Sequence, residues 1–343
     1  MALHPSIASG VSEILSRLGD AKVSFAGQRV LVTGGAGFLG SWVCDVLVAQ
    51  GAEVVCLDNL SSGLATHVAH LHERDEFTFI EHDISQPYYP EGGLDCVLHL
   101  ASRASPMEFD KHPISILKAN TLGIWIALGI AKAKDARVMY ASTSEVYGDP
   151  DPRFVPSPET YNGNVNPVGV RGCYDEAKRC GEAFVIAYVR QHGLNARIAR
   201  IFNTYGPRIR SEGIYGRALP RFLDQAISGK PITIFGTGEQ TRSFTYVVDE
   251  VEGLLRLAAT DNAKGKVVNI GNTVERSILD LARAVQAASG TEVDLVFEPL
   301  PDDDPLRRCP DITKAKQILG WEPTVTLEEG LVPTVAWFRD QSA

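Results

Sequence analysis

Short apolar runs alternate with longer segments of helical periodicity from Arg29 to about Thr204. The runs are rich in Val and Ile, as expected for strands buried on both faces of a sheet. The predicted strands are RVLVTG (29–34), EVVCLD (53–58), FTFIEHD (77–83), CVLHLAS (96–102), RVMYAS (137–142) and ARIARIFN (196–203). Between them, apolar residues recur at helical spacing. This alternation predicts an α/β fold, a Rossmann doubly wound parallel sheet.

The alternation loosens after Gly206, which predicts a smaller C-terminal α/β substrate-binding lobe. We expect residues 1–28 to form an N-terminal helical extension, 29–205 the Rossmann domain, and 206–343 the lobe. Residues 241–262 are expected to return to the Rossmann domain, whereas KVVNIG (266–271) and DLVFEPL (294–300) are predicted strands of the lobe. The extension is predicted to be an amphipathic helix, because apolar residues recur on one side of it: Ile7, Val11, Ile14, Leu15 and Leu18.

Composition narrows the class of protein. The 343 residues are 44% apolar and 22% charged, which excludes a disordered chain. The net charge of −9 argues against nucleic acid as a partner. The chain has no run of about 18 apolar residues and no signal-peptide core, so neither a membrane span nor a membrane partner is expected. None of the six cysteines forms a C-x-x-C pair, which favours reduced thiols in a cytoplasmic protein over disulfides, and no metal site is expected.

A glycine cluster follows the first predicted strand in TGGAGFLG (33–40). Gly34 suits a tight turn, Gly37 lets backbone approach a diphosphate, and Gly40 permits close packing of helix on strand. The helix that begins here would offer its free N–H groups to the diphosphate. Asp58 ends the next strand, where a carboxylate accepts hydrogen bonds from ribose hydroxyls and repels a 2′-phosphate, so the cofactor is expected to be NAD rather than NADP. The alternative is a structural turn with a helix-capping aspartate.

Further cofactor contacts are expected at the carboxyl ends of the same strands, where ligands bind in open α/β sheets. Asp83 is placed to reach the adenine amino group, or else caps its own loop. The other candidate cofactor-binding residues are Phe38, Leu39, Asn59, Ser61, Ser62, Ile84, Leu100, Ser102, Tyr174 and Lys178.

Tyr174 and Lys178 stand four residues apart on a predicted helix and therefore share one face, about 6 Å apart. A cationic lysine favours the phenolate form of tyrosine. Bringing the pKa of the phenol from about 10 to about 7 requires about 4 kcal/mol, which Lys178 and an oxidised nicotinamide are expected to supply. The predicted strand 137–142 is followed directly by Thr143, Ser144 and Glu145, at the same edge of the sheet. These three residues are therefore expected to face Tyr174.

These segments together resemble the extended short-chain dehydrogenase/reductase superfamily. The matching strings are TGGAGFLG, STSEVYG, YDEAK and RIFNTYGPR. Within it, the chain resembles the UDP-glucuronate decarboxylase (UDP-xylose synthase) family from about Arg29 to its end, through ASTSEVYGDP, most positions of NPVGVRGCYDEAKR and GEQTRSF, and the segment around Arg307–Arg308. Gly172 and Ala177 differ slightly from the commonest family residues. The resemblance implies NAD-dependent decarboxylation of UDP-glucuronate to UDP-xylose through a 4-keto intermediate.

The resemblance also implies roles for individual residues. The catalytic residues would be Thr143, Glu145, Tyr174, Lys178 and Arg308, with Arg308 holding the sugar carboxylate. The substrate-binding residues would be Tyr89, Lys118, Ser144, Asn203, Arg217, Arg242 and Arg308, with Arg242 on the diphosphate. The superfamily pairs the helices that correspond to the predicted apolar helices at 114–133 and 173–191 into a four-helix bundle, so a homodimer is expected. A purely structural role remains open for Arg242, Tyr89 and Lys118.

The Thr-Ser-Glu triplet separates related activities. Sugar-nucleotide 4,6-dehydratases carry an acid where Ser144 stands, plant apiose/xylose synthases carry a cysteine there, and most 4-epimerases lack the acid at Glu145. The runner-up hypotheses are a UDP-glucuronate 4-epimerase or another nucleotide-sugar-modifying member of the superfamily. A non-catalytic NAD-binding protein is a third, disfavoured by the intact Tyr174–Lys178 pair.

Arg103 departs from the family, which has proline at this point of HLASRASP (99–106). One interpretation is a surface arginine. The other is an altered pocket with a looser loop, since proline no longer fixes the backbone, so that some UDP-4-keto-xylose escapes before the final reduction.

Overall fold

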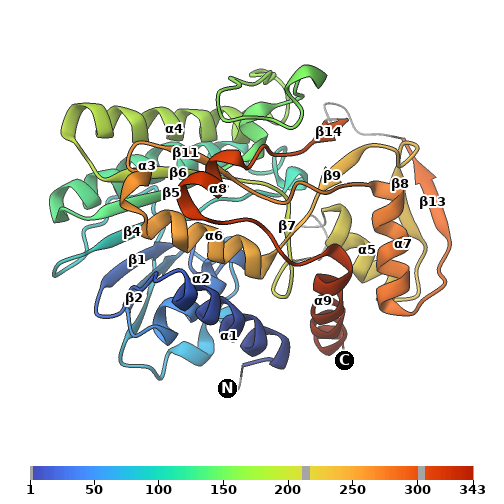
Figure 1. Cartoon of the computed structure of the whole chain (residues 1–343), viewed down its shortest axis with the longest axis horizontal. Helices are drawn as coiled ribbons and strands as arrows, with labels where there is room; N and C mark the ends of the chain where they lie inside the picture. Colours follow the sequence, from blue (N-terminus) through green and yellow to red (C-terminus); the bar gives the residue numbers. More distant parts are fainter. Residues whose placement is uncertain (1–2, 211–216, 300–305, 343) are drawn as a thin grey trace.

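The computed structural model describes residues 3–210, 217–299 and 306–342. Seven parallel strands form the main sheet in the order β11-β6-β5-β4-β1-β2-β3. Their bounds are β1 Arg29–Thr33, β2 Glu53–Asp58, β3 Phe77–Glu81, β4 Cys96–His99, β5 Arg137–Thr143, β6 Ala196–Ile201 and β11 Val267–Ile270. The first six strands confirm the predicted runs. The sheet is the expected doubly wound one, with helices on both faces (Figure 1).

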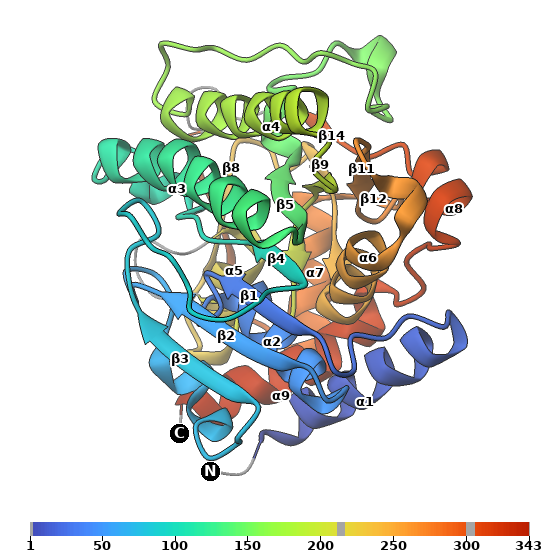
Figure 2. The same ribbon diagram turned by 90° about the vertical axis from the view of Figure 1, so that its left-hand side faces the viewer.

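Two layers of helix cover the sheet. The helices α3 (Pro113–Lys134) and α4 (Gly172–His192) lie on one face, and α2 (Phe38–Ala49) and α6 (Val247–Ala259) on the other (Figure 2). By length and composition alone, α3 is also apolar enough to cross a membrane, but 44% of its apolar window is buried inside the fold. The contacts of α3 with α4, β4 and β5 are those of a helix that packs on a sheet.

The N-terminal helix α1 (Pro5–Asp20) packs on α6 and α2. Its predicted apolar side is buried, and the Gly10 backbone lies against the Trp42 ring, where a Cβ would come within 2.8 Å. Arg17 adds ion pairs from α1 to Asp249 at 2.6 Å and Glu252 at 3.1 Å. The extension is therefore part of the Rossmann core rather than a separate arm.

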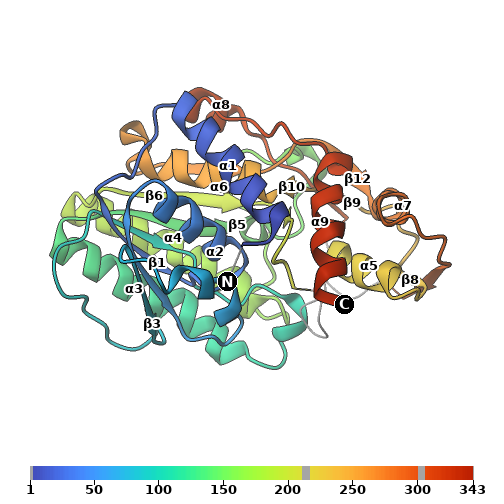
Figure 3. The same ribbon diagram turned by 90° about the horizontal axis from the view of Figure 1, so that it is seen from below.

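The smaller lobe lies to one side of the main sheet (Figures 1 and 3). It contains the pairs β8–β13 and β7–β10 and the three-stranded sheet β12-β9-β14. The strand bounds are β7 Thr204–Tyr205, β8 Ile232–Phe235, β9 Thr241–Ser243, β10 Thr245–Tyr246, β12 Glu275–Ser277, β13 Leu295–Glu298 and β14 Arg307–Arg308; the helices are α5 Ala218–Ile227, α7 Ile278–Ser289 and α9 Leu327–Ser342. The short helix α8 Thr313–Leu319 packs instead on β11 and α6, beside the main sheet.

Two segments lie elsewhere than the sequence pattern indicated. The strand at 267–270, predicted for the lobe, is the edge strand β11 of the main sheet, parallel to β6. Within 241–262, α6 returns to the main sheet as expected, but β9 pairs with β12 and β14 in the lobe. A four-residue apolar run suits either sheet, so its place depends on contacts distant in sequence.

Candidate active site

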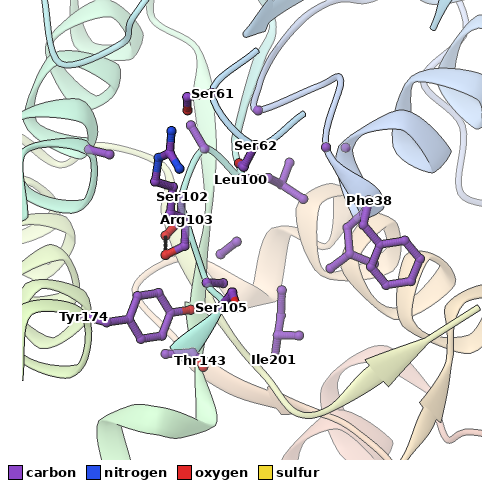
Figure 4. Close-up of a pocket in the computed structure, with 18 of the residues that line it drawn as sticks. Phe38, Ser61, Ser62, Leu100, Ser102, Arg103, Ser105, Thr143, Tyr174 and Ile201 are labelled. Carbon is purple, nitrogen blue, oxygen red and sulfur yellow. Dashed lines mark hydrogen bonds between the residues drawn. The ribbon is translucent and has the colours of Figure 1, made fainter. Parts of the chain in front are cut away.

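A cavity lies at the carboxyl edge of the main sheet, between the Rossmann domain and the smaller lobe (Figure 4). The parallel strands end together at this edge, so the loops that follow them supply its walls. Every residue expected to contact the cofactor lines this cavity: Gly34, Gly37, Phe38, Leu39, Gly40, Asp58, Asn59, Ser61, Ser62, Asp83, Ile84, Leu100, Ser102, Tyr174 and Lys178. Their individual roles stay predictions.

The glycine turn between β1 and α2 forms one wall. Gly34 has a φ of 72°, and a Cβ on it would lie 2.7 Å from the Ala101 backbone. A Cβ on Gly40 would lie 2.1 Å from the Gly34 carbonyl oxygen. Both positions therefore require glycine, one for conformation and one for close packing. This geometry leaves the N-terminus of α2 open to the cavity, where it suits an anion.

Asp58 lies at the end of β2 on the same side of the cavity. Its carboxylate accepts hydrogen bonds from the backbone N–H groups of Ala36 at 2.9 Å and Leu60 at 2.8 Å. The first bond ties Asp58 to the glycine turn. Burial raises the pKa of this carboxyl group, and the two backbone bonds oppose that rise.

Tyr174 and Lys178 project from the first turns of α4, and both side chains are buried. The Tyr174 ring stacks on Phe109, with a centroid distance of 5.2 Å, and its phenol lies beside the Thr143 hydroxyl at the end of β5 (Figure 4). Lys178 Nζ lies 5.8 Å from the Tyr174 ring centroid and donates a hydrogen bond to the Ala141 carbonyl oxygen at 2.7 Å. The predicted pair thus converges on one spot with Thr143.

Burial dominates the electrostatics of this pair. It raises the pKa of Tyr174 to about 12, opposed by the positive charge of Arg217. It also lowers the pKa of Lys178 to about 7, opposed by Glu182. The sequence hypothesis expected Lys178 to favour the phenolate. In the protein alone, burial outweighs the positive charge of Arg217 on the pKa of Tyr174, so a further positive charge in the cavity is needed to ionise Tyr174.

Lys178 should therefore make the stability of the cofactor-free protein depend on pH. The folded chain releases this proton near pH 7, whereas the unfolded chain holds it to about 10.5. Because the unfolded state binds more protons between these values, the free energy of unfolding attributable to Lys178 rises with pH across that window. Lys178→Met should remove this contribution and raise the free energy of unfolding at pH 7 by about 1–4 kcal/mol. Urea unfolding at pH 7 and 9 measures both effects, with Lys230→Met, at an exposed lysine, as the control. An unchanged slope would contradict the prediction.

Glu145 is held between two arginines. Its carboxylate is bound by Arg308 of β14 and by Arg171, the residue that precedes α4. Burial alone would raise the pKa of Glu145, but the charges of Arg308 and Arg171 hold it well below its usual range. Glu145 is therefore an ionised group that accepts hydrogen bonds, rather than a proton donor.

Arg171 is the residue that our sequence analysis missed. Besides Glu145 it approaches Asp175, with Nε 3.7 Å from Oδ2, and it lies over the Phe109 ring. Arg171 stands three residues before Tyr174 in NPVGVRGCYDE, so the sequence already placed it beside the predicted helix that carries Tyr174 and Lys178. What the sequence could not show is that this helix start meets the end of β5.

The structure places only some of the expected substrate-binding residues in the cavity wall; Arg242, Arg308, Tyr89 and Lys118 are not among its lining residues. Ser144, Asn203 and Arg217 line the cavity, and Arg217 donates a hydrogen bond to the Ala104 carbonyl oxygen at 2.7 Å. Arg242 lies next to Arg308 in the register of β9 and β14, and both side chains are buried. The acidic run at 302–304, which precedes β14 in the sequence, lies outside the described residues.

Tyr89 and Lys118 do not line the cavity. The Tyr89 side chain is 64% exposed and lies under Lys134 Nζ at 4.2 Å, at the end of α3. The residues of α3 that line the cavity, Ser115 and Ala119, lie near its beginning. The structure therefore separates Tyr89 from the site, because its loop runs toward the far end of α3. Lys118 is exposed on α3 beside Ala119.

Arg103 is not a surface residue. Its side chain is 14% exposed, forms an ion pair with the buried Glu108, and lines the cavity. The interpretation as a surface arginine is therefore wrong.

The residues present fit a dinucleotide such as NAD. A glycine turn that side chains would fill, an open helix N-terminus and a carboxylate fixed at the end of β2 lie on one wall. These are the parts that a diphosphate and an adenosine ribose require. Tyr174, Thr143 and Glu145 line the same cavity, where a second molecule would meet the cofactor.

Comparisons with known proteins agree with this geometry. Residues 30–271 match the model of a family described as "NAD dependent epimerase/dehydratase family". The chain is 46% identical to UDP-glucuronic acid decarboxylase 1 of Xenopus tropicalis over 314 residues, which are 92% of this chain and 73% of that protein. It is 44% identical to UDP-glucuronic acid decarboxylase 5 of Arabidopsis thaliana, over 92% of this chain and 91% of that one. Among solved structures, the UDP-glucuronic acid 4-epimerase of Bacillus cereus in complex with UDP-glucuronic acid and NAD is 28% identical, with a TM-score of 0.80 over 91% of this chain and 99% of that one.

Proposed function

The chain belongs to the NAD dependent epimerase/dehydratase family, and from that membership and its site we propose that it is an NAD-dependent UDP-glucuronate decarboxylase that forms UDP-xylose. The observation that carries this proposal is the group formed by Glu145, Arg308 and Arg171 beside Tyr174. A base such as Tyr174 serves any oxidation of a sugar hydroxyl. The two arginines are the more specific feature, because a planar guanidinium group suits recognition of a carboxylate.

Tyr174, as the phenolate, removes the proton from the sugar 4-hydroxyl. A bound NAD would supply the acceptor for the hydride from carbon 4 of the sugar and would later return that hydride, so the cycle would consume no oxidant. Thr143 donates a hydrogen bond to the same sugar oxygen. The Gly34 turn and Asp58 hold the dinucleotide in place, and Lys178 holds a hydrogen bond to the Ala141 backbone behind Tyr174.

The resulting 4-ketone stands next to the carbon that carries the carboxylate, so the sugar is now a β-keto acid. The bond between carbon 5 and the carboxyl carbon breaks, CO2 leaves, and the electron pair is delocalised as an enolate onto the carbon 4 oxygen. Arg308 and Arg171 orient the carboxylate, and the ionised Glu145 orients water that protonates carbon 5. Tyr174 returns its proton to the carbon 4 oxygen when the ketone is reduced.

A direct test is to incubate the purified protein with UDP-glucuronate and NAD and to determine the product masses. We expect loss of one CO2 per sugar and UDP-xylose as the main product. The ratio of UDP-xylose to UDP-4-keto-xylose in the same assay tests the expected release of some 4-keto product. A UDP-glucuronate 4-epimerase would give an isomer of unchanged mass. A product that keeps its carboxylate would overturn the proposal in favour of that alternative.

We also propose that the protein is a homodimer that buries α3 and α4 in a four-helix bundle. Exposed apolar side chains on α3 support this: Ile114 is 63% exposed, Leu122 42% and Trp125 50%. Apolar area of this kind is usually covered by a partner, and a twofold interface would bring the same residues together.

Trp125→Glu should convert this dimer into a monomer, because a charge would be buried at the interface without a partner. Light scattering after gel filtration measures the mass. Phe297→Glu, at an apolar residue of β13 that is 57% exposed, is the control and should leave the dimer intact. A native mass of one chain, or dimers of the Trp125→Glu variant, would contradict the arrangement.

We propose that the protein acts in the cytoplasm. All six cysteines are free, and Cys44, Cys56, Cys96 and Cys309 are buried, as suits a reducing compartment. Titration of thiols in the unfolded protein as isolated from cells should find six free thiols, and fewer would argue for an oxidising compartment.

A further inference from the structure

The loop after β4 carries an ion pair into the wall of the cavity. Arg103 Nη1 binds Glu108 Oε1, and both residues line the cavity. Glu108 is 1% exposed, and the Arg103 side chain is 14% exposed. Arg103 Nε is buried and has no hydrogen-bond partner among the described residues. The accessible part of the Arg103 side chain thus lies at the edge of a site that must accept a ligand, and the hydrogen bond to Glu108 uses only one of its nitrogen atoms.

The loop is fixed against the glycine turn. The Ala101 backbone fills the space where a side chain on Gly34 would lie, and Arg217 binds the Ala104 carbonyl oxygen. Arg103 stands between these two anchored residues. In the view of Figure 4 its guanidinium extends toward Ser61 and away from Tyr174. It therefore faces the part of the cavity expected to hold the cofactor, rather than the reacting sugar.

The negative charge of Glu108 indicates why a cation such as Arg103 lies in the cavity wall. A buried carboxylate in a cavity that takes an anionic dinucleotide repels the ligand unless a cation compensates it. Arg103 supplies that cation. A guanidinium fixed by a carboxylate on one edge also keeps N–H groups for a phosphate on another, in a planar geometry that matches phosphate oxygens.

We propose that Arg103 is a cofactor-binding residue that donates hydrogen bonds to the diphosphate of NAD, with Glu108 as the residue that positions its guanidinium. The proposal rests on the use of NAD in the proposed function. A 2′-phosphate is a poorer candidate for the bound anion, because Asp58 occupies the ribose position with a fixed carboxylate.

This assignment reverses the effect that the sequence alone suggested for Arg103. An arginine in place of proline was expected to loosen the loop and to let intermediate escape. An arginine that binds the diphosphate would instead slow dissociation of the cofactor. Retention matters here, because the hydride must return to the same sugar before the cofactor leaves.

The experiment measures nucleotide binding to the purified full chain without any UDP-sugar, by calorimetry with ADP, adenosine and adenosine 2′-monophosphate. Arg103→Met should weaken ADP binding about 10- to 100-fold, the range for a hydrogen bond to a charged group. Adenosine binding should change by less than about 3-fold, because it lacks the diphosphate. Equal loss for adenosine, or a loss confined to adenosine 2′-monophosphate, would overturn the proposal.

A second comparison separates direct contact from mere neutralisation of Glu108. Removing Arg103 leaves Glu108 uncompensated, which could itself weaken ADP binding or destabilise the fold. The double variant Arg103→Met/Glu108→Gln is therefore compared with Glu108→Gln alone. We expect the double variant to bind ADP at least about 10-fold more weakly. Equal affinities would show that Arg103 only neutralises Glu108. Since no UDP-sugar is present, this result stands apart from failure of the decarboxylation assay.

Discussion

Tyr174→Phe should lower the rates of NADH formation and of CO2 release from UDP-glucuronate by about 10³-fold, the scale of general base catalysis. The variant loses only the phenolic oxygen beside Thr143. Its ring keeps the stack on Phe109, with the centroids 5.2 Å apart, so fold and cofactor binding should be retained. Single-turnover absorbance of NADH and trapping of CO2 measure the two steps.

The control for this variant is its affinity for NAD, which should remain within about 3-fold of the native value. If CO2 release persisted at a near-native rate, Tyr174 would not be the base, and oxidation at carbon 4 would have to begin elsewhere. Loss of NAD binding together with activity would mean that the phenol positions the cofactor instead.

Arg308→Met should lower kcat/KM for UDP-glucuronate by about 10²- to 10³-fold, equivalent to about 3–4 kcal/mol. Arg308 is 3% exposed and binds Glu145, so its removal leaves that carboxylate with Arg171 alone and deprives the substrate carboxylate of its partner. The affinity for NAD should change little, because the glycine turn and Asp58 are untouched.

The neighbouring Arg307 provides a matched control. Its side chain is 48% exposed and pairs with Glu275, so Arg307→Met should retain activity within about 3-fold. Binding of UDP-glucose, which lacks the carboxylate, should be similar in native protein and Arg308→Met. An equal loss of affinity for both UDP-sugars would show that Arg308 stabilises the structure around β14 and does not recognise the carboxylate.

The sequence predicted the parts of the site that depend on local spacing. Gly34, Gly40 and Asp58 lie where strand, turn and helix place them, and the Tyr174–Lys178 pair needs only one helix turn. The strands β1 to β6 of the main sheet were predictable as short apolar runs, most clearly β1, β2, β4 and β5, whose residues are almost all buried. These features involve neighbours in the chain, and local periodicity is sufficient to identify them.

Contacts between distant segments could not be predicted in the same way. Arg308 and Glu145 are 163 residues apart, and only the family resemblance brought them together. Arg171 was missed because it precedes α4, whereas its partner Glu145 follows β5, which is distant in the sequence. The edge strand β11 was assigned to the wrong sheet, and Tyr89 was expected in a cavity that its loop does not reach. In each case the position depends on packing between elements, which periodicity does not record.

In the proposed reaction, hydride leaves carbon 4, CO2 is lost, and the same hydride returns to carbon 4. UDP-glucuronate labelled with deuterium at carbon 4 tests all three parts in one reaction with unlabelled NAD, read by mass spectrometry and NMR. We expect UDP-xylose that has lost the carboxyl group and carries deuterium at carbon 4. A product that keeps its carboxylate, or UDP-xylose without deuterium at carbon 4, would contradict the proposed reaction.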